Sequence, residues 1–192
     1  MRRLRFLALL AVLALASPAL GRSTEPKRLP SFALTDHHGE PFSLATMRGR
    51  WTVLALGYTS CPDICPFTLM NLEDVLTVLS TRMAPERLPR IVFLAVDPAR
   101  DRPVLAAFMR NFHPAFLGIS GSENEVSSLV AALDGVARHE PADALGNYAV
   151  VHSAFLSVVD PTGRVVAKLY PPLDPGPTAD ALARLLRAAP AS

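Results

Sequence analysis

Apolar residues along this chain follow two different spacings, which together predict a mixed α/β fold. Continuous apolar runs over residues 51–57 and 91–96 are typical of buried strands. Between these runs, leucine and valine recur at three- and four-residue spacing from Pro66 to about Met83, which predicts an amphipathic helix. The order strand, helix, strand indicates a parallel βαβ unit in the middle of the chain.

Weaker patterns on either side of this unit complete the succession. Turn residues at 36–39 and at 160–163 lie between alternating apolar residues, and each set predicts a hairpin. The other expected elements are a helix over 103–112, a strand over 115–119, a helix that opens at the capping box 122–125, a polar loop over 135–147 and a last helix over 178–188. This order predicts a thioredoxin-like mixed sheet flanked by helices, with an N-terminal hairpin and a strand–helix segment inserted at about 114–147.

The N-terminal segment has the pattern of an export signal. Three arginines, an apolar run and then small residues occupy residues 1–21. We expect this segment to be a cleaved signal peptide or, if it is not cleaved, a short membrane anchor that tethers the protein. Residues 22–30 are expected to be a polar linker, and residues 31–192 a single domain.

Charge argues against a nucleic-acid partner. Three of the 19 basic residues lie in residues 1–21, so the remaining chain carries 16 basic residues against 17 acidic ones and has no basic patch. Export would place the domain in the periplasm or at the outer face of the inner membrane, where thiols are exposed to oxidation. Two cysteines left free there would tend to oxidise unless a metal or a reductant protects them.

Cys61 and Cys65 are the only cysteines of the chain, and three residues separate them. Pro66 fits the first position of the predicted helix, which makes Cys65 its expected N-cap. At that place the positive end of the helix dipole would favour a thiolate. The pair could form a structural disulfide, act as a redox dithiol or chelate a metal, and the spacing alone leaves all three open.

His152 differs from the other histidines because it interrupts an apolar stretch over 148–151. The predicted topology returns it to the end of the sheet that carries the cysteines. Two thiolates and an imidazole are soft ligands that favour Cu(I) or Zn(II) over hard cations. Thioredoxin-like oxidoreductases usually have a proline near this position, and its absence beside His152 weakens a purely redox interpretation. His139, by contrast, is expected in a polar loop.

Asp97 follows the second buried strand, at the same end of the sheet. A carboxylate in that place could orient a metal ligand or a partner, or it could lie in a solvated turn. Asp101 is expected to be structural, as a helix cap.

Three motifs, in this order, resemble the Sco/SenC copper-binding proteins. They are residues 57–66 around the cysteines, residues 96–101 around Asp97 and residues 148–153 around His152, and the resemblance extends over about 31–188. It implies a thioredoxin-like fold that binds one copper ion through Cys61, Cys65 and His152. Asp97 matches an acid implicated in copper-site function. In the family the residue before the histidine is commonly aspartate, whereas here it is Val151, so a charge beside the histidine is absent.

The resemblance also implies a role in building the binuclear copper centre of cytochrome c oxidase. We expect a metallochaperone, rather than an enzyme, that takes copper from an upstream periplasmic donor and delivers it to the copper-bearing subunit of the oxidase. The alternatives are a thiol-disulfide reductase that keeps the cysteines of the oxidase reduced, and a redox sensor. Cu(I) is expected on the thiolates, Cu(II) could also be held, and zinc is a rival ion.

Overall fold

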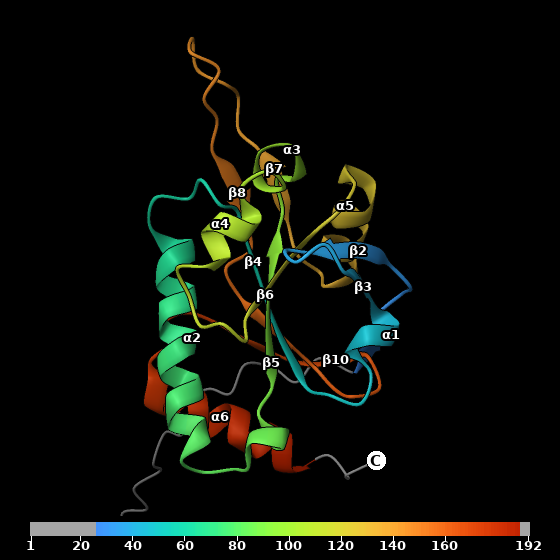
Figure 1. Cartoon of the computed structure of the whole chain (residues 1–192), viewed down its shortest axis with the longest axis vertical. Helices are drawn as coiled ribbons and strands as arrows, with labels where there is room; N and C mark the ends of the chain where they lie inside the picture. The colour runs from blue at the N-terminus through green and yellow to red at the C-terminus, as the bar shows by residue number, and fades with distance from the viewer. Residues whose placement is uncertain (1–25, 189–192) are drawn as a thin grey trace, which may run out of the picture.

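A mixed sheet of eight strands lies at the centre of the protein, with helices on both of its sides (Figure 1). The computed structural model describes residues 26–188. The strands lie in the order β1-β10-β9-β4-β5-β6-β2-β3. Their bounds are β1 Lys27–Arg28, β2 Ala33–Asp36, β3 Pro41–Ser43, β4 Thr52–Gly57, β5 Arg90–Ala95, β6 Leu117–Ser120, β9 Leu156–Val159 and β10 Arg164–Leu169.

The central strands β4, β5 and β6 are parallel, as the βαβ pattern predicts. Every residue of β4 is buried. Burial on both faces explains why β4 and β5 are continuous apolar runs rather than alternating ones. The remaining pairs of this sheet are antiparallel, including the predicted hairpins β2–β3 and β9–β10.

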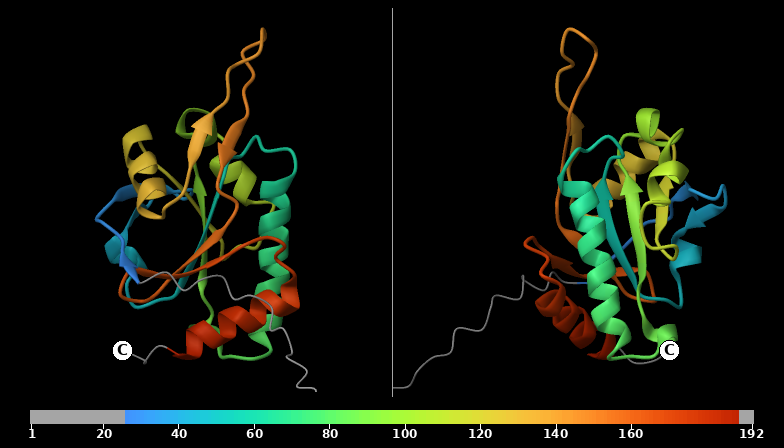
Figure 2. Two further views of the ribbon diagram at one scale, coloured as in Figure 1. Left: turned by 180° about the vertical axis from the view of Figure 1, so that it is seen from behind. Right: turned by 60° about the vertical axis from the view of Figure 1, so that its left-hand side comes forward.

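Helices cover both sides of the sheet. α2 and α6 contact each other on one side, and α5 lies on the other (Figures 1 and 2). The apolar residues of α2 that recur at helical spacing are buried, as predicted. The helices are α1 Leu44–Met47, α2 Ile64–Ser80, α3 Pro98–Asp101, α4 Leu105–Met109, α5 Glu123–Ala132 and α6 Pro175–Ala188, with a 3₁₀ turn at Pro85–Arg87.

A second sheet of two strands stands out from the body of the molecule (Figure 2). β7, Ala137–His139, pairs in antiparallel register with β8, Val150–His152. The prediction that residues 135–147 are entirely loop is therefore wrong at β7. Three residues contain too few alternations to show a strand in the sequence, and the pairing partner of β7 lies 11 residues further along.

The fold also begins earlier than the predicted domain boundary at residue 31. Lys27 and Arg28 pair with β10, and the side chain of Leu29 is buried. The predicted segment 1–21 lies outside the described residues, as do residues 22–25 of the predicted linker. Within residues 26–188 we find no helix that is long and apolar enough to cross a membrane.

The turn between β9 and β10 is built on one buried carboxylate. Asp160 accepts hydrogen bonds from the Thr162 N–H at 2.8 Å, the Arg164 N–H at 3.0 Å and the Arg164 Nε–H at 3.2 Å. Burial raises the pKa of Asp160, but hydrogen bonds from Thr162 and Arg164 outweigh burial and hold the pKa below its usual value.

We expect Asp160→Asn to lower the free energy of unfolding by about 1–2 kcal/mol at neutral pH, because hydrogen bonds to a charged acceptor are lost. The folded-state pKa is lowered, so this stability is present above the unfolded-state pKa and is lost as the pH falls through the folded value. Urea unfolding of both proteins at about pH 7 and about pH 3 measures the difference. A difference that does not shrink at the lower pH would contradict this account.

Candidate metal centre

The cysteine-bearing loop begins where β4 ends, at Gly57. A Cβ atom on Gly57 would collide with the ring of Phe93 and lie 3.0 Å from Cys65 Sγ. Glycine is therefore required at this position so that the sulfur can pack against the end of the central strand. The sulfur of Cys65 therefore packs directly against the last residue of the central strand β4.

The helix after this loop begins earlier than predicted. α2 starts at Ile64 with Asp63 as its N-cap, so Cys65 is the second helical residue and the prediction that it is the N-cap is wrong. Pro66 is then the third residue, which a helix tolerates because the N–H groups of its first turn have no intrahelical partner. Pro66 therefore does not mark the first residue of the helix.

Both cysteines are free thiols, and both are buried: 8% of Cys61 and 3% of Cys65 is exposed. The two side chains lie close enough for each to shift the pKa of the other. Burial raises the pKa of Cys65, so the expected thiolate at this residue is not favoured in the metal-free protein. Burial also raises the pKa of Cys61, but hydrogen bonds from the Asp63 N–H and from Cys65 outweigh it, and the pKa of Cys61 is lowered. Cys61 is thus the more acidic thiol.

His152 lies at the end of β8 and faces Cys65. Its Nε2 atom is 3.5 Å from Cys65 Sγ, and its Nδ1 atom is 3.1 Å from the carbonyl oxygen of Ser153. A carbonyl only accepts hydrogen bonds, so in the neutral ring Nδ1 carries the proton and the lone pair of Nε2 points at the sulfur. The ring of Tyr58 meets the His152 ring edge-on, with centroids 5.8 Å apart.

The structure thus brings the three predicted ligands into one chain of contacts, with Cys65 in the middle. The donor atoms, two sulfurs and an imidazole nitrogen, suit a soft ion. Across residues 26–188, however, no three His, Cys, Asp or Glu side chains are grouped so that they could hold a metal ion as they stand. Binding an ion at this place would require a rearrangement of these side chains.

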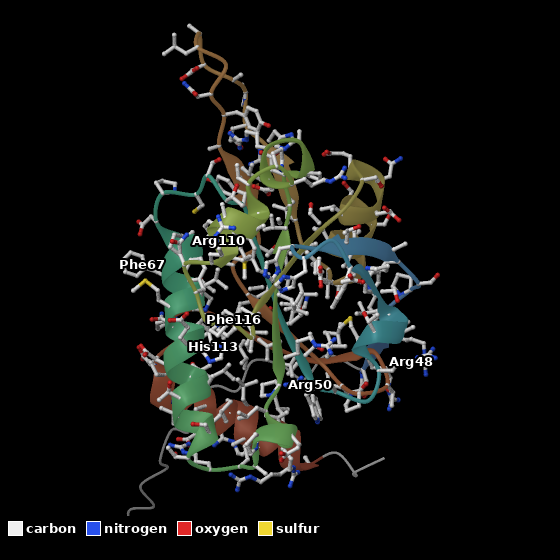
Figure 3. All side chains as sticks on the ribbon, viewed as in Figure 1. Arg48, Arg50, Phe67, Arg110, His113 and Phe116 are labelled. Atoms are coloured by element: carbon white, nitrogen blue, oxygen red, sulfur yellow. The ribbon has the colours of Figure 1, made fainter. Side chains whose placement is uncertain are left out.

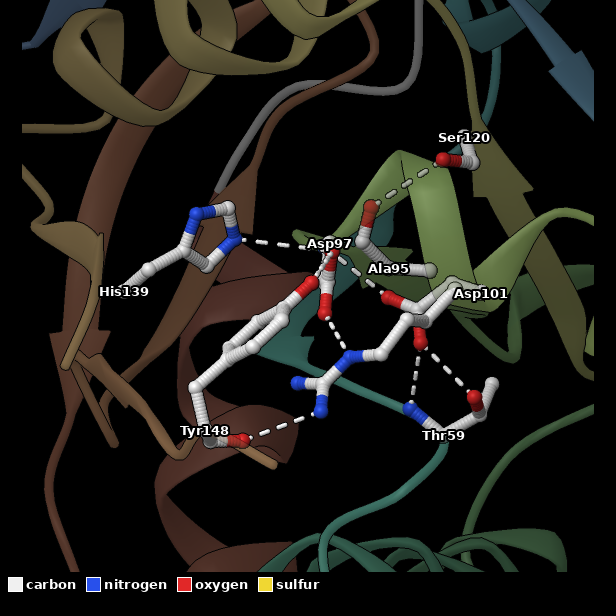
Figure 4. A network of polar contacts seen from close by, with 8 residues as sticks. Thr59, Ala95, Asp97, Asp101, Ser120, His139 and Tyr148 are labelled. Atoms are coloured by element: carbon white, nitrogen blue, oxygen red, sulfur yellow. Dashed lines mark hydrogen bonds and ion pairs between the residues drawn. The ribbon is translucent and has the colours of Figure 1, made fainter. Parts of the chain in front are cut away.

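Asp97 is fully buried, so the alternative of a solvated turn is wrong. Its carboxylate forms an ion pair with Arg100, accepts a hydrogen bond from the Tyr148 hydroxyl at 3.2 Å and lies 3.4 Å from His139 Nε2 (Figure 4). None of these partners is a predicted metal ligand, so any influence of Asp97 on the ligands passes through neighbouring residues.

Asp101 joins the cysteine loop to α3. It accepts hydrogen bonds from the N–H and the hydroxyl of Thr59, both at 2.7 Å, and from the N–H of Asp97 at 2.9 Å (Figure 4). Burial raises the pKa of Asp101, and these hydrogen bonds only partly offset it. Asp101 is structural, as predicted: it binds the N-cap residue of α3 and also connects α3 to the cysteine loop.

Sequence reasoning missed four residues around the site: Tyr58, Arg100, His139 and Tyr148. Tyr58 and Tyr148 lie inside the motifs that carry the cysteines and His152, and Arg100 lies in the motif of Asp97. The sequence indicated these three residues only through their place in the motifs. No signal pointed to His139, which joins the cluster only because β7 pairs with β8.

Apolar side chains on α2 face solvent close to the cysteines. Ile64, Phe67 and Met70 recur at three-residue spacing and are each about half exposed, at 48%, 55% and 51%. Figure 3 shows Phe67 pointing outward from α2. They share one face of the helix because residues three apart are neighbours on its surface.

Comparison with known proteins identifies related sequences and structures. A family model described as SCO1/SenC matches residues 21–187. The SCO2-like protein of Rickettsia felis is 34% identical over 148 residues, which cover 76% of this chain and 70% of that protein. The crystal structure of yeast Sco1 with copper bound has a TM-score of 0.78 at 28% identity and covers 86% of this chain and 91% of that one.

A more distant structure shares the fold. BsSco, described as a member of the Sco family of cytochrome c oxidase assembly proteins, has a TM-score of 0.66 at 20% identity over 85% of this chain and 93% of its own. At this identity the likeness shows the fold alone. Together these structures confirm the predicted thioredoxin-like fold.

The two thiols should differ in reactivity. At neutral pH we expect iodoacetamide to modify Cys61 faster than Cys65, because the pKa of Cys61 is lowered and that of Cys65 is raised by burial. Peptide mass spectrometry after short exposures of the reduced, metal-free protein gives both rates. Cys61→Ser should remove the fast phase, and Cys65→Ser should keep it. Faster modification of Cys65 in the parent protein would contradict the assignment.

Proposed function

The chain belongs to the SCO1/SenC family, and from that premise we propose that it is a copper metallochaperone. It binds one copper ion through Cys61, Cys65 and His152 and delivers it to the binuclear copper site of cytochrome c oxidase. The observation that carries this proposal is the position of Cys65 Sγ, which contacts the Cys61 thiol and lies 3.5 Å from His152 Nε2.

The chemistry of the donors supports copper as the cargo. Two thiolates and a neutral imidazole favour Cu(I), and the same set can hold Cu(II), with zinc as a competitor. His152 is already in the tautomer that leaves Nε2 free to bind. The yeast relative has been crystallised with copper bound.

Delivery requires a site that gives up its ion. A site with few ligands, beside exposed residues of the loop before α2, allows a thiolate of the recipient to bind the ion before a ligand of this protein leaves. Cys61 lies in the loop before α2, and its neighbours Asp63 and Ile64 are exposed. The ion then moves by stepwise ligand exchange, with no change in its oxidation state.

The recipient and the compartment follow from the same premise. We propose that the recipient is the copper-bearing subunit of cytochrome c oxidase and that the donor is an upstream periplasmic copper protein. Residues 1–21 would direct export, so that the folded domain that follows binds copper in the periplasm or, tethered, at the outer face of the inner membrane.

One observation favours a second candidate, a thiol-disulfide reductase. The two free thiols contact each other and differ in acidity, as a nucleophile and a resolving thiol do. The Cys61 thiolate would attack a disulfide of the oxidase subunit and release one of its thiolates. Cys65 would then attack the mixed disulfide, so that the subunit leaves with both cysteines reduced and Cys61 and Cys65 are joined as a disulfide. This reaction does not need His152.

Copper binding tests the ligand set. We expect the full chain, reduced and titrated anaerobically, to bind one copper ion, and Cys61→Ser, Cys65→Ser and His152→Ala each to lose at least tenfold in affinity because a ligand is removed. With Cu(II), a thiolate charge-transfer band should appear in the parent and change in His152→Ala. His38→Ala, which alters an exposed histidine far from the cysteines in the chain, is the matched control. Parental affinity in all three ligand variants would refute the proposal.

Oxidase assembly in cells separates the two candidates. A copper chaperone needs His152, so His152→Ala should reduce cytochrome c oxidase activity as severely as the double variant Cys61→Ser, Cys65→Ser. A reductase would tolerate His152→Ala and fail only when the cysteines are changed. The copper content of the oxidase subunit and the redox state of its cysteines, measured in the same cells, identify the step that is lost.

A further inference from the structure

Arg100 lies between the buried carboxylate of Asp97 and the two segments that carry the proposed copper ligands. Asp97 is fully buried, and a buried carboxylate requires a compensating charge or hydrogen bonds. Arg100, one turn along α3, forms an ion pair with it through Nε. The guanidinium is therefore held at one end by Asp97.

On one side, Arg100 fixes the strand that carries His152. Its Nη1 donates to the carbonyl oxygen of Tyr148 at 2.9 Å, and its Cζ lies 3.6 Å from the centre of the Tyr148 ring. The Tyr148 hydroxyl in turn donates to Asp97 (Figure 4). Tyr148 is thus held at its backbone, its ring and its hydroxyl, two residues before β8 begins.

On the other side, Arg100 approaches the ring of Tyr58, the residue that follows β4 and precedes the cysteines. Its Cζ lies 5.9 Å from the centre of this ring. Tyr58 is 8% exposed, and its ring meets His152 edge-on at 5.8 Å with an angle of 82° between the planes. Arg100 therefore approaches Tyr58, which contacts the His152 ring, and binds Tyr148, which lies four residues before His152 in the chain.

We propose that Arg100 is the positioning residue of this site: by holding Tyr58 and Tyr148 it aims His152 Nε2 at Cys65 Sγ. The inference rests on the proposed function and adds to it a residue that does not bind the ion. The role of orienting a ligand, expected of Asp97 from the sequence, belongs in this view to Arg100, which Asp97 anchors. One guanidinium nitrogen, Nη2, is buried and has no hydrogen-bond acceptor within residues 26–188. A buried nitrogen without an acceptor costs free energy, and the guanidinium of Arg100 nevertheless keeps this position.

The guanidinium of arginine is planar and its N–H groups point in fixed directions, which makes the role specific to arginine. Lysine keeps the positive charge but cannot donate in two fixed directions while stacking on an aromatic ring. Arg100→Lys and Arg100→Met should therefore have similar effects if position matters, whereas lysine should restore the parental behaviour if charge alone matters.

The test uses the full chain, reduced and purified in mild detergent, with two measurements on each variant. In the metal-free protein, NMR correlations of the His152 imidazole report its tautomer. In the copper-loaded protein, titration reports affinity, and the thiolate-to-Cu(II) band reports ligand geometry. Arg138→Met is the matched control, because Arg138 is exposed in β7 and, within residues 26–188, its side chain pairs only with the partly exposed Glu140.

In Arg100→Met and Arg100→Lys we expect the single Nδ1–H form of His152 to become a mixture. Copper affinity should fall by about 10- to 100-fold, as for other residues that orient metal ligands, and the band should shift. Arg138→Met should match the parent. An unchanged His152 signal together with an unchanged band in Arg100→Met would overturn the inference, and so would full recovery of both in Arg100→Lys.

Two further variants keep the inference testable. If Arg100→Met does not fold, as judged by circular dichroism, Tyr58→Leu removes the ring that lies on His152 and leaves the Asp97 cluster in place. It should change the His152 signal, and Arg100→Lys added to it should have a smaller effect than Arg100→Lys alone, since the contact with Tyr58 is then already lost and only that with Tyr148 remains. Additive effects would overturn the inference. If the parent fails to bind copper, the proposed function fails, while the metal-free NMR comparison still decides the role of Arg100.

Discussion

The buried carboxylate of Asp97 must be compensated within the protein, and the groups that compensate it come from separate parts of the chain. Arg100 lies in α3, and His139 and Tyr148 belong to the projecting hairpin. The backbone of Asp97 is bound by Asp101, which also holds the cysteine loop through Thr59. Because an unpaired charge is costly away from water, this one requirement fixes the loop, α3 and the hairpin relative to one another.

The hairpin depends on this cluster more than on apolar packing. It forms a sheet of its own and is not part of the central one. Val150, two residues before His152, is buried, whereas Val151 is 41% exposed and Leu145 is 87% exposed. Polar contacts at its base therefore determine where His152 lies. This explains how a residue on a projecting element can approach a buried sulfur closely.

The cysteines lie where the apolar core meets the end of the sheet. Burial there disfavours the thiolate of Cys65 as long as no cation is present. A bound metal ion takes the place of the proton, so ion binding and proton release are coupled. The same burial excludes hydrated ions, which suits a site of sulfur and imidazole donors. Next to this site, α2 exposes three apolar side chains to solvent, those of Ile64, Phe67 and Met70.

The sequence by itself determined the central strands, the amphipathic helix and the identity of the three candidate ligands. Those features depend on local periodicity and on residue chemistry, which neighbouring positions report directly. Only the tertiary structure decided that α2 begins at Ile64, that β7 pairs with β8 and that Arg100 connects Asp97 to Tyr58 and Tyr148. These features depend on contacts between residues far apart in the chain and on the balance between burial and hydrogen bonding. The pKa of Cys65 shows this most clearly: the helix start predicts a thiolate, but desolvation, which no local pattern reports, is the larger effect.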